Sequence, residues 1–159
     1  MNFSNPVTPS SIRLILAEDH TLLRRVMAQF LGQEPDIEIV GEASDGESAV
    51  KLASQLLPDI VIMDLGMPKM SGLEATRAIR HELPQVRVIA LSIYEEKERA
   101  DAMLEAGASA YLTKTKSAQE LIATIRSCMK TEMVVARGPR GIASKASDVS
   151  NRDVNASPL

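Results

Sequence analysis

Short apolar runs alternate with amphipathic segments along most of this chain. Five such runs are present: Ile12–Ala17, Ile37–Ala43, Ile60–Met63, Val86–Leu91 and Ala110–Leu112. The first, third and fourth runs are rich in Val, Ile and Leu with little alternation, which is typical of strands covered on both faces. The second run alternates more, which favours an edge strand.

Helical patterns lie between the apolar runs. Apolar residues recur at helical spacing from Leu22 to Leu31 and again from Leu121 to Met129. Capping boxes predict three helix starts: Ser44 with Glu47, Ser71 with Glu74, and Ser117 with Glu120. A further helix from about Glu95 is predicted to end at Gly107, which is suited to a left-handed cap.

A strand followed by a helix, five times over, predicts an α/β fold with a doubly wound five-stranded parallel sheet and helices on both faces. We assign residues 12–130 to this domain and residues 1–11 to an N-terminal extension. From about Thr131 the sequence has no apolar periodicity and many small or polar residues, so we expect 131–159 to be a polar, flexible tail.

Composition narrows the class of protein. With 159 residues, 45% of them hydrophobic, the chain can bury a substantial core. A net charge of -3 argues against a generic nucleic-acid or membrane surface. The one cysteine, Cys128, cannot form an intrachain disulfide, which favours a reducing compartment. Without a secretory signal or an apolar run of membrane-spanning length, we expect a cytoplasmic protein.

Polar residues follow four of the five predicted strands. Glu18 and Asp19 follow the first, Asp64 the third, Ser92 the fourth and Lys114 the fifth. Ligands of doubly wound sheets bind beyond the carboxyl ends of the strands. In the flavodoxin-like strand order 2-1-3-4-5, the first and third strands lie side by side, roughly 5 Å apart, which would bring the three carboxylates together.

Three carboxylates that close repel one another unless a cation joins them. A hard divalent ion with oxygen ligands fits best, so we predict Mg²⁺. Lys114, roughly 10 Å away across two strand spacings, can extend its ammonium group toward Asp64, and Ser92 lies between them. A metal, an ammonium and a hydroxyl around one carboxylate would stabilise a phosphoryl group on Asp64. His20 stands alone and is interpreted as a helix-start residue.

These residues occur within a set of longer motifs. The motifs are "AEDH" from Ala17, "DLGMPKMSG" from Asp64, "ALS" from Ala90 and "AGASAYLTK" from Ala106. In this order, the chain from about Ile12 to Lys130 resembles the receiver domain of two-component response regulators. "DHTLLRRVM", "GASAYLTK" and "ELIATIR" are most similar to the NarL/FixJ (LuxR-type) subfamily.

The resemblance implies a role for each site residue. Asp64 would accept a phosphoryl group from a phosphohistidine of a sensor histidine kinase. Asp19 and Asp64 would bind Mg²⁺ directly, Glu18 would act through water, and the main-chain carbonyl of Gly66 would be a further ligand.

The resemblance also implies a switch. Ser92 and Lys114 would hold the phosphoryl oxygens, and Ser92 would then shift while the aromatic Tyr111 rotates inward. The surface formed by the fourth helix, fifth strand and fifth helix would pass this change to the output and could support a phosphorylation-dependent homodimer.

Two features depart from the family pattern. Thr115 stands where the family usually has a proline after the lysine, often with a cis bond, so the isomer of the Lys114–Thr115 bond is open. The subfamily usually continues into a helix-turn-helix DNA-binding domain, but the residues after Lys130 are too few and too polar for one. We therefore expect either a receiver-only protein or a regulator without its output domain.

Simpler interpretations stay open for each residue. Asp19 could cap a helix, although Glu18 beside it would then be unexplained. Asp64 could merely end a strand, Ser92 could be a turn serine, and Lys114 a solvated lysine. Tyr111 could equally be a packed edge tyrosine.

Other functions are weaker alternatives to a signalling module that catalyses its own phosphorylation. A DNA-binding regulator would require a recognition helix. A haloacid-dehalogenase-type phosphatase usually has a second acidic residue two positions after its nucleophile, where this chain has Gly66. Flavin binding would place a phosphate against three carboxylates, which would repel it unless a metal intervened.

Overall fold

The computed structural model describes residues 10–131, which form alternating strands and helices. The strands are β1 (Ile12–Ala17), β2 (Ile37–Ala43), β3 (Ile60–Asp64), β4 (Arg87–Ser92) and β5 (Ala110–Thr113). The helices are α1 (Thr21–Gly32), α2 (Gly46–Leu56), α3 (Gly72–Glu82), α4 (Lys97–Ala106) and α5 (Ala118–Lys130). The predicted βα order is confirmed: β1 and β2 have the predicted bounds, and β3, β4 and β5 differ from the predicted bounds by one residue.

All strand pairs are parallel, and the strand order is β2-β1-β3-β4-β5. This order confirms the doubly wound sheet and the edge position of β2. Because β1 pairs with β3, and β3 with β4, the carboxyl ends of these three strands lie side by side. We call this border of the sheet its carboxyl edge.

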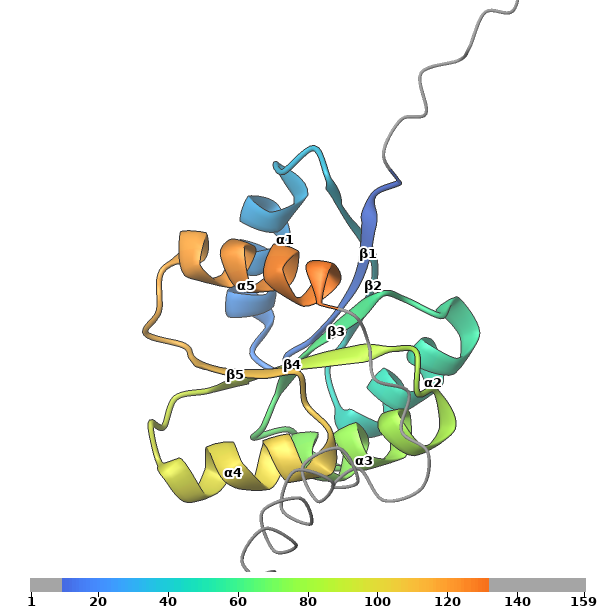
Figure 1. Ribbon diagram of the computed structural model, residues 1–159, viewed down its shortest axis with the longest axis vertical. Helices are drawn as coiled ribbons and strands as arrows, with labels where there is room; N and C mark the ends of the chain where they lie inside the picture. Colours follow the sequence, from blue (N-terminus) through green and yellow to red (C-terminus); the bar gives the residue numbers. More distant parts are fainter. Residues whose placement is uncertain (1–9, 132–159) are drawn as a thin grey trace, which may run out of the picture.

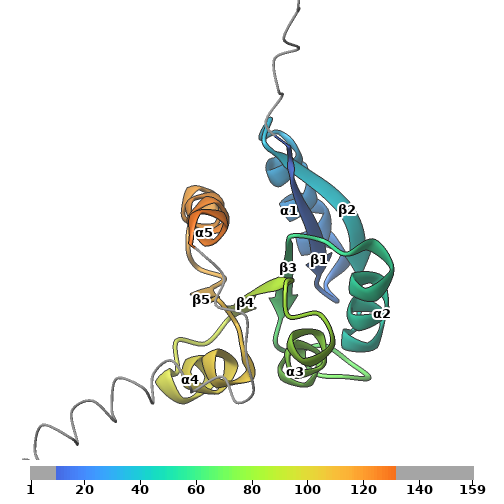
Figure 2. The same ribbon diagram turned by 45° about the vertical axis from the view of Figure 1, so that its right-hand side comes forward.

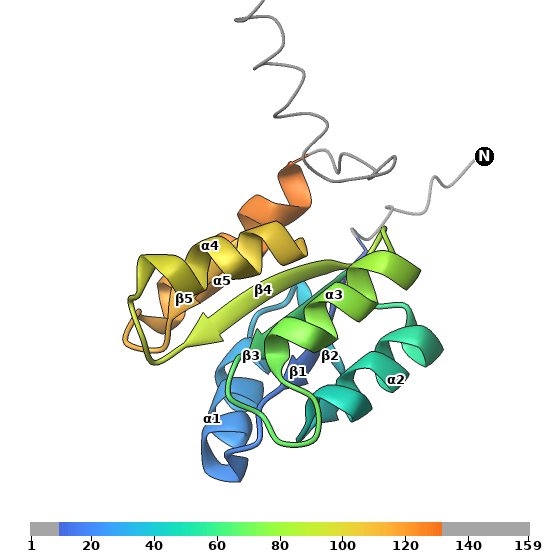
Figure 3. The ribbon, with the colours of Figure 1, turned by 90° about the horizontal axis from the view of Figure 1, so that it is seen from below.

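Helices cover both faces of the sheet. Figure 1 shows α1 and α5 together on one face and α2, α3 and α4 on the other, and Figure 2 shows α5 and α4 on opposite sides of β4 and β5. Seen from below, α4, α3 and α2 lie across the near face (Figure 3). The described residues form three core clusters, one under α1 and α5, one under α2 and α3, and a smaller one that includes Met103 of α4.

The central strand β3 has the most complete burial. Ile60 to Met63 are at most 1% exposed, because helices pack on both faces of this strand. Its apolar side chains alternate between the two cores, with Ile60 and Ile62 in one and Val61 and Met63 in the other. This explains why the sequence of the strand does not alternate between apolar and polar residues.

Two of the three predicted capping boxes are confirmed as helix starts. Ser71 accepts the Glu74 N–H, and Ser117 accepts the Glu120 N–H. The third prediction is wrong: Asp45, not Ser44, caps α2, because its carboxylate accepts the Ser48 N–H at 2.7 Å.

The predicted end of α4 is confirmed, and its predicted start is two residues early. Gly107 adopts the left-handed conformation with φ of 111°. The helix begins at Lys97, after Glu96 as its N-cap. Apart from Thr131, the predicted tail lies outside the described residues, as do residues 1–9 of the predicted N-terminal extension. Within 10–131, no helix is long and apolar enough to cross a membrane.

Candidate functional site

The polar residues predicted at the strand ends converge at the carboxyl edge of the sheet. Asp64 is the last residue of β3, Glu18 and Asp19 follow β1, and Ser92 ends β4. One carboxylate oxygen of each of Glu18, Asp19 and Asp64 lies within 4.8 Å of the others. Strands 1 and 3 are neighbours, and this pairing brings together acids that are separated by 45 positions in the sequence.

The acids differ in their exposure to solvent. Glu18 and Asp64 are 2% and 5% exposed, whereas Asp19 is exposed. The Glu18 carboxylate accepts the His20 N–H at 3.2 Å. His20 is the N-cap of α1, and its Nδ1 accepts the Leu23 N–H, so its interpretation as a helix-start residue is confirmed.

Lys114 reaches the acidic cluster from β5. Its Nζ lies 2.7 Å from Glu18 Oε2 and 3.0 Å from Asp64 Oδ1. The main chain supports this reach, since the Lys114 N–H donates to the Ser92 carbonyl at 2.7 Å. The Lys114–Thr115 bond is trans, and the Thr115 hydroxyl lies 3.0 Å from that of Thr113. Lys114 is therefore not a solvated surface lysine in this structure.

Burial and pairing act in opposite directions on the charges of the cluster. Burial raises the pKa of the Glu18 carboxyl, the nearby Asp64 charge adds to this, and the Lys114 ammonium opposes it. Burial works to lower the pKa of Lys114, but its hydrogen bonds to Glu18 and Asp64 outweigh burial and leave the pKa raised. Lys114 is thus held as a cation between two acids.

Ser92 and Tyr111 both bond to the same residue of the β4–α4 loop. Ser92 is 2% exposed, and its hydroxyl accepts the Tyr94 N–H at 3.1 Å. The half-buried Tyr111 donates its hydroxyl to the Tyr94 carbonyl at 2.7 Å. A shift of Ser92 would therefore disturb a peptide segment that Tyr111 also holds.

The loop after Asp64 approaches the start of α3 closely. Gly66 is exposed, with open space where a Cβ would be, and its N–H lies 3.4 Å from Asp64 Oδ1. Gly72 opens α3 so near the strand that an added Cβ would lie 2.2 Å from the Asp64 carbonyl. This role of Gly72 has no signal in the sequence, because only the close approach of two segments reveals it.

Arg24 is a second residue whose place at the site is not predicted by the sequence. Its guanidinium donates to the Glu18 carbonyl at 2.7 Å and to Glu42 at 3.1 Å. The sequence has two adjacent arginines, and nothing local distinguishes Arg24, which turns toward the site, from the exposed Arg25.

The donor set fits a hard divalent cation. Three carboxylates converge on one edge of the sheet, and oxygen ligands of this kind suit Mg²⁺. The same cluster holds a cation already, Lys114, within reach of Asp64. The arrangement can therefore neutralise negative charge placed on or near the Asp64 carboxylate.

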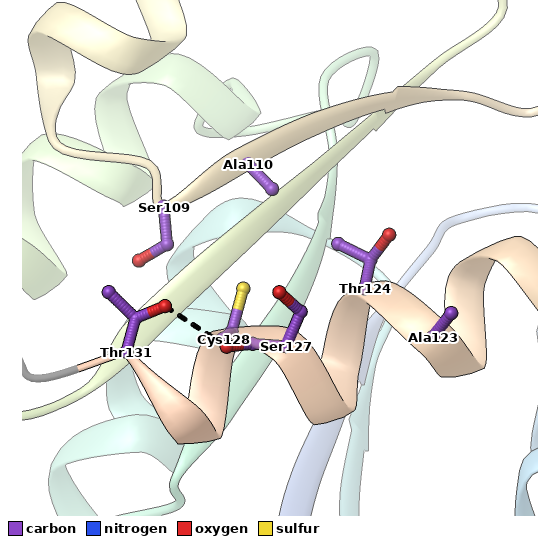
Figure 4. Close-up of a pocket in the computed structure, with 7 residues that line it drawn as sticks. All are labelled: Ser109, Ala110, Ala123, Thr124, Ser127, Cys128 and Thr131. Carbon is purple, nitrogen blue, oxygen red and sulfur yellow. Dashed lines mark hydrogen bonds between the residues drawn. The ribbon is translucent and has the colours of Figure 1, made fainter.

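A hollow of about 370 Å³ lies elsewhere, between the start of β5 and the C-terminal half of α5. Figure 4 shows its lining of small neutral side chains, including Ser109, Ala123 and Cys128. Burial raises the pKa of the Cys128 thiol, which disfavours a reactive thiolate. The hollow offers no charged group to a ligand and lies at the amino end of β5, away from the acidic cluster.

Comparison with known proteins gives consistent matches over the described part of the chain. The model of the response regulator receiver domain matches residues 14–126. The transcriptional regulatory protein LiaR of Bacillus subtilis is 44% identical over 121 residues, which are 76% of this chain and 57% of LiaR. The chain spans between 51% and 59% of the length of its curated relatives LiaR, DegU and VraR.

Solved structures of response regulators also superpose on this chain. The signal receiver domain of the response regulator NarL from Mycobacterium tuberculosis superposes with a TM-score of 0.75 at 30% identity, covering 78% of this chain and 100% of that chain. A DNA-binding response regulator of the LuxR family from Staphylococcus aureus gives 0.70 at 32% identity, covering 74% of this chain and 98% of the other.

Proposed function

Because the chain belongs to the response regulator receiver-domain family, in its NarL/LuxR-type branch, we propose that it is a phosphorylation-activated switch. A sensor histidine kinase is its proposed phosphodonor and Asp64 its phosphoacceptor. The observation that carries this proposal is the position of Asp64: it is buried at a strand end, 3.0 Å from Lys114 Nζ and grouped with two other acids. The protein is then a signalling module more than a turnover enzyme.

The proposed reaction is a phosphoryl transfer between side chains. A carboxylate oxygen of Asp64 attacks the phosphorus of a phosphohistidine. The new O–P bond forms as the N–P bond breaks, and the electron pair of that bond returns to the imidazole. Lys114 would hold a phosphoryl oxygen through its ammonium, and Ser92 through its hydroxyl. Catalysis of this kind depends on positioning and charge neutralisation, which these two groups can supply.

Glu18, Asp19, Asp64 and the Gly66 carbonyl are the proposed holders of Mg²⁺. When bound, the ion supplies positive charge to the carboxylates and to the oxygens of the incoming phosphoryl group. Asp19 is the exposed acid and can take the ion directly. Glu18, already bonded to Lys114 and His20, is better suited to act through water.

Ser92 and Tyr111 form the proposed switch. The Ser92 hydroxyl accepts the Tyr94 N–H. If that hydroxyl turns to a phosphoryl oxygen, the β4–α4 loop is released from Ser92, and Tyr111, whose hydroxyl donates to the Tyr94 carbonyl, would change its position with the loop. The change would then spread from the loop, where Tyr94 is exposed, over the surface of α4, β5 and α5, where Leu104 of α4 is exposed.

Control of transcription is the proposed output. LiaR and DegU are named transcriptional regulatory proteins, and this chain corresponds to about half of their length. A DNA-binding part would therefore lie outside the matched segment, with nucleic acid contacted only there. A phosphorylation-dependent homodimer through the α4–β5–α5 surface is part of the same proposal.

The first test is intact mass spectrometry after incubation with acetyl phosphate. We expect one added phosphoryl group on the parent chain in the presence of Mg²⁺. We expect none when Mg²⁺ is removed by chelation, and none on Asp64→Ala. A phosphoryl group that persists on Asp64→Ala would place the acceptor elsewhere, and no addition under any condition would contradict the proposed reaction.

A further inference from the structure

The geometry points to Arg24 as a positioning residue for Mg²⁺ binding. Its guanidinium contacts the Glu18 carbonyl and the Glu42 carboxylate at once, and so fixes the short acidic loop that carries Asp19. The inference rests on the Mg²⁺ site proposed above. It goes beyond that site because Arg24 is not itself a metal ligand.

The contacts of Arg24 join three parts of the chain. Its Nη1 donates to the Glu18 carbonyl at 2.7 Å, and its Nε donates to Glu42 Oε1 at 3.1 Å. Its own main-chain N–H donates to the His20 carbonyl at 2.9 Å. The Arg24 side chain is 18% exposed and its charge-assisted bond to the Glu18 carbonyl is partly buried, whereas the Glu42 side chain is 45% exposed, so the bond to Glu42 is open to solvent.

The C-terminal end of β2 secures the peptide groups on both sides of Glu18. The Glu18 N–H donates to the Ala43 carbonyl at 3.0 Å. Glu42, the preceding residue of β2, holds the arginine that contacts the Glu18 carbonyl. The Glu18 carboxylate is fixed as well, by His20 and Lys114.

Asp19 depends on this arrangement more than Glu18 does. It is exposed, and the carbonyl that Arg24 holds belongs to the peptide bond that joins Glu18 to Asp19. Rotation of that peptide would swing the Asp19 carboxylate away from Asp64. Groups that orient a metal ligand typically change metal affinity by about 10- to 100-fold when they are removed.

Positioning of the loop by Arg24 and charge repulsion by its guanidinium predict opposite effects on Mg²⁺ affinity when Arg24 is removed. A guanidinium near a cation site repels the cation, so its removal by charge alone would tighten Mg²⁺ binding. If Arg24 positions the loop, its removal weakens binding despite the lost positive charge. Whether removal of the Arg24 side chain weakens or tightens Mg²⁺ binding therefore decides between positioning and charge repulsion.

The test is isothermal titration calorimetry with MgCl₂ on the full chain, together with thermal unfolding of each variant. For Arg24→Ala we expect the dissociation constant to rise about tenfold, the lower end of the range for orienting groups. Arg24→Lys keeps the charge but has one ammonium for two acceptors, and should fall between Arg24→Ala and the parent. Arg25→Ala removes the neighbouring exposed arginine, and we expect unchanged or slightly tighter binding.

The outcomes separate this inference from the proposed function. A parent chain that does not bind Mg²⁺ contradicts the metal site and the inference together. A parent that binds, with unchanged or tighter binding in Arg24→Ala, contradicts the inference alone. If Arg24→Ala does not fold, Arg24→Lys decides: weaker Mg²⁺ binding with an unchanged unfolding midpoint supports the inference, and parent-like affinity overturns it.

Discussion

At the scale of single residues, Lys114 balances the charge of the acidic cluster. Its ammonium lies within 3.0 Å of oxygens of both Glu18 and Asp64 and is 17% exposed. Two buried carboxylates at this spacing repel each other, and the lysine offsets that repulsion. Mg²⁺ would bring a second cation to the same acids, so the two cations compete electrostatically while both attract a phosphoryl group.

Lys114→Met should therefore destabilise the metal-free protein and tighten Mg²⁺ binding. We expect a loss of about 1–3 kcal/mol in the free energy of unfolding in EDTA, less than for a fully buried pair because the side chain is partly exposed. Added Mg²⁺ should recover part of this loss, since a ligand of the folded state stabilises it. Chemical denaturation with EDTA and with Mg²⁺ measures both effects.

Lys116→Ala is the matched control for this change, because Lys116 is an exposed lysine two positions further on. It should leave the unfolding free energy within about 0.5 kcal/mol of the parent. Equal losses of unfolding free energy in Lys114→Met and Lys116→Ala in EDTA would contradict this role of Lys114. So would a loss in Lys114→Met that becomes larger when Mg²⁺ is added.

At the scale of elements, the site depends on how closely two helix starts approach the loop after β3. A Cβ on Gly72 would lie 2.2 Å from the Asp64 carbonyl, and one on Gly46 would lie 2.0 Å from the Met70 carbonyl. Neither glycine has a positive φ, so their requirement is for space and not for an unusual backbone. The start of α3 is packed directly against main-chain atoms of Asp64 and Leu65, and the start of α2 against those of Met70, in the loop that follows Asp64 and carries Gly66.

Gly72→Ala should lower stability, because main-chain atoms cannot yield as the end of a flexible side chain can. Inserted atoms in packed regions typically cost about 1–3 kcal/mol, and we expect a loss in this range by chemical denaturation. Gly66→Ala lies in the same loop and has open space at its Cβ, so its stability should match the parent. A Gly72→Ala protein as stable as the parent would show that α3 can move outward without cost.

At the scale of the whole molecule, one sheet unites the described residues. The core clusters of the described residues lie between this sheet and the helices on its two faces. Arg126 of α5 adds a link between distant segments through ion pairs with Glu34 and Asp36, before β2. We therefore propose that residues 12–130 form one cooperatively folding domain.

A fragment of residues 10–131 should unfold in a single transition at the midpoint of the full chain. The physical reason is that the apolar contacts of the described core are all retained in the fragment. Thermal unfolding followed by circular dichroism compares the two proteins. A midpoint that is several degrees lower in the fragment would assign a stabilising role to the remaining residues and contradict the proposed domain boundaries.

The sequence by itself determined the order of elements and the chemical character of the site. Unbroken apolar runs such as Ile60–Met63 identified buried strands, because a strand covered on both faces has no polar side. The acids, hydroxyl and lysine stood out because each follows such a run. Ser71 and Ser117 identified helix starts because hydrogen bonding at an N-cap is local. The α2 cap was misassigned because Ser44 and Asp45 are adjacent possible acceptors, and the fold selects between them.

Only the tertiary structure decided which atoms meet. Strand pairing, set by burial over the whole sheet, placed Glu18 beside Asp64 and brought Lys114 into contact with both. The role of Arg24 depends on the end of β2, 18 residues away in sequence at Glu42, and that of Gly72 on a close approach of two main-chain segments. Such contacts leave no local pattern in a sequence, because their energy comes from segments that meet only when the sheet and its helices have packed.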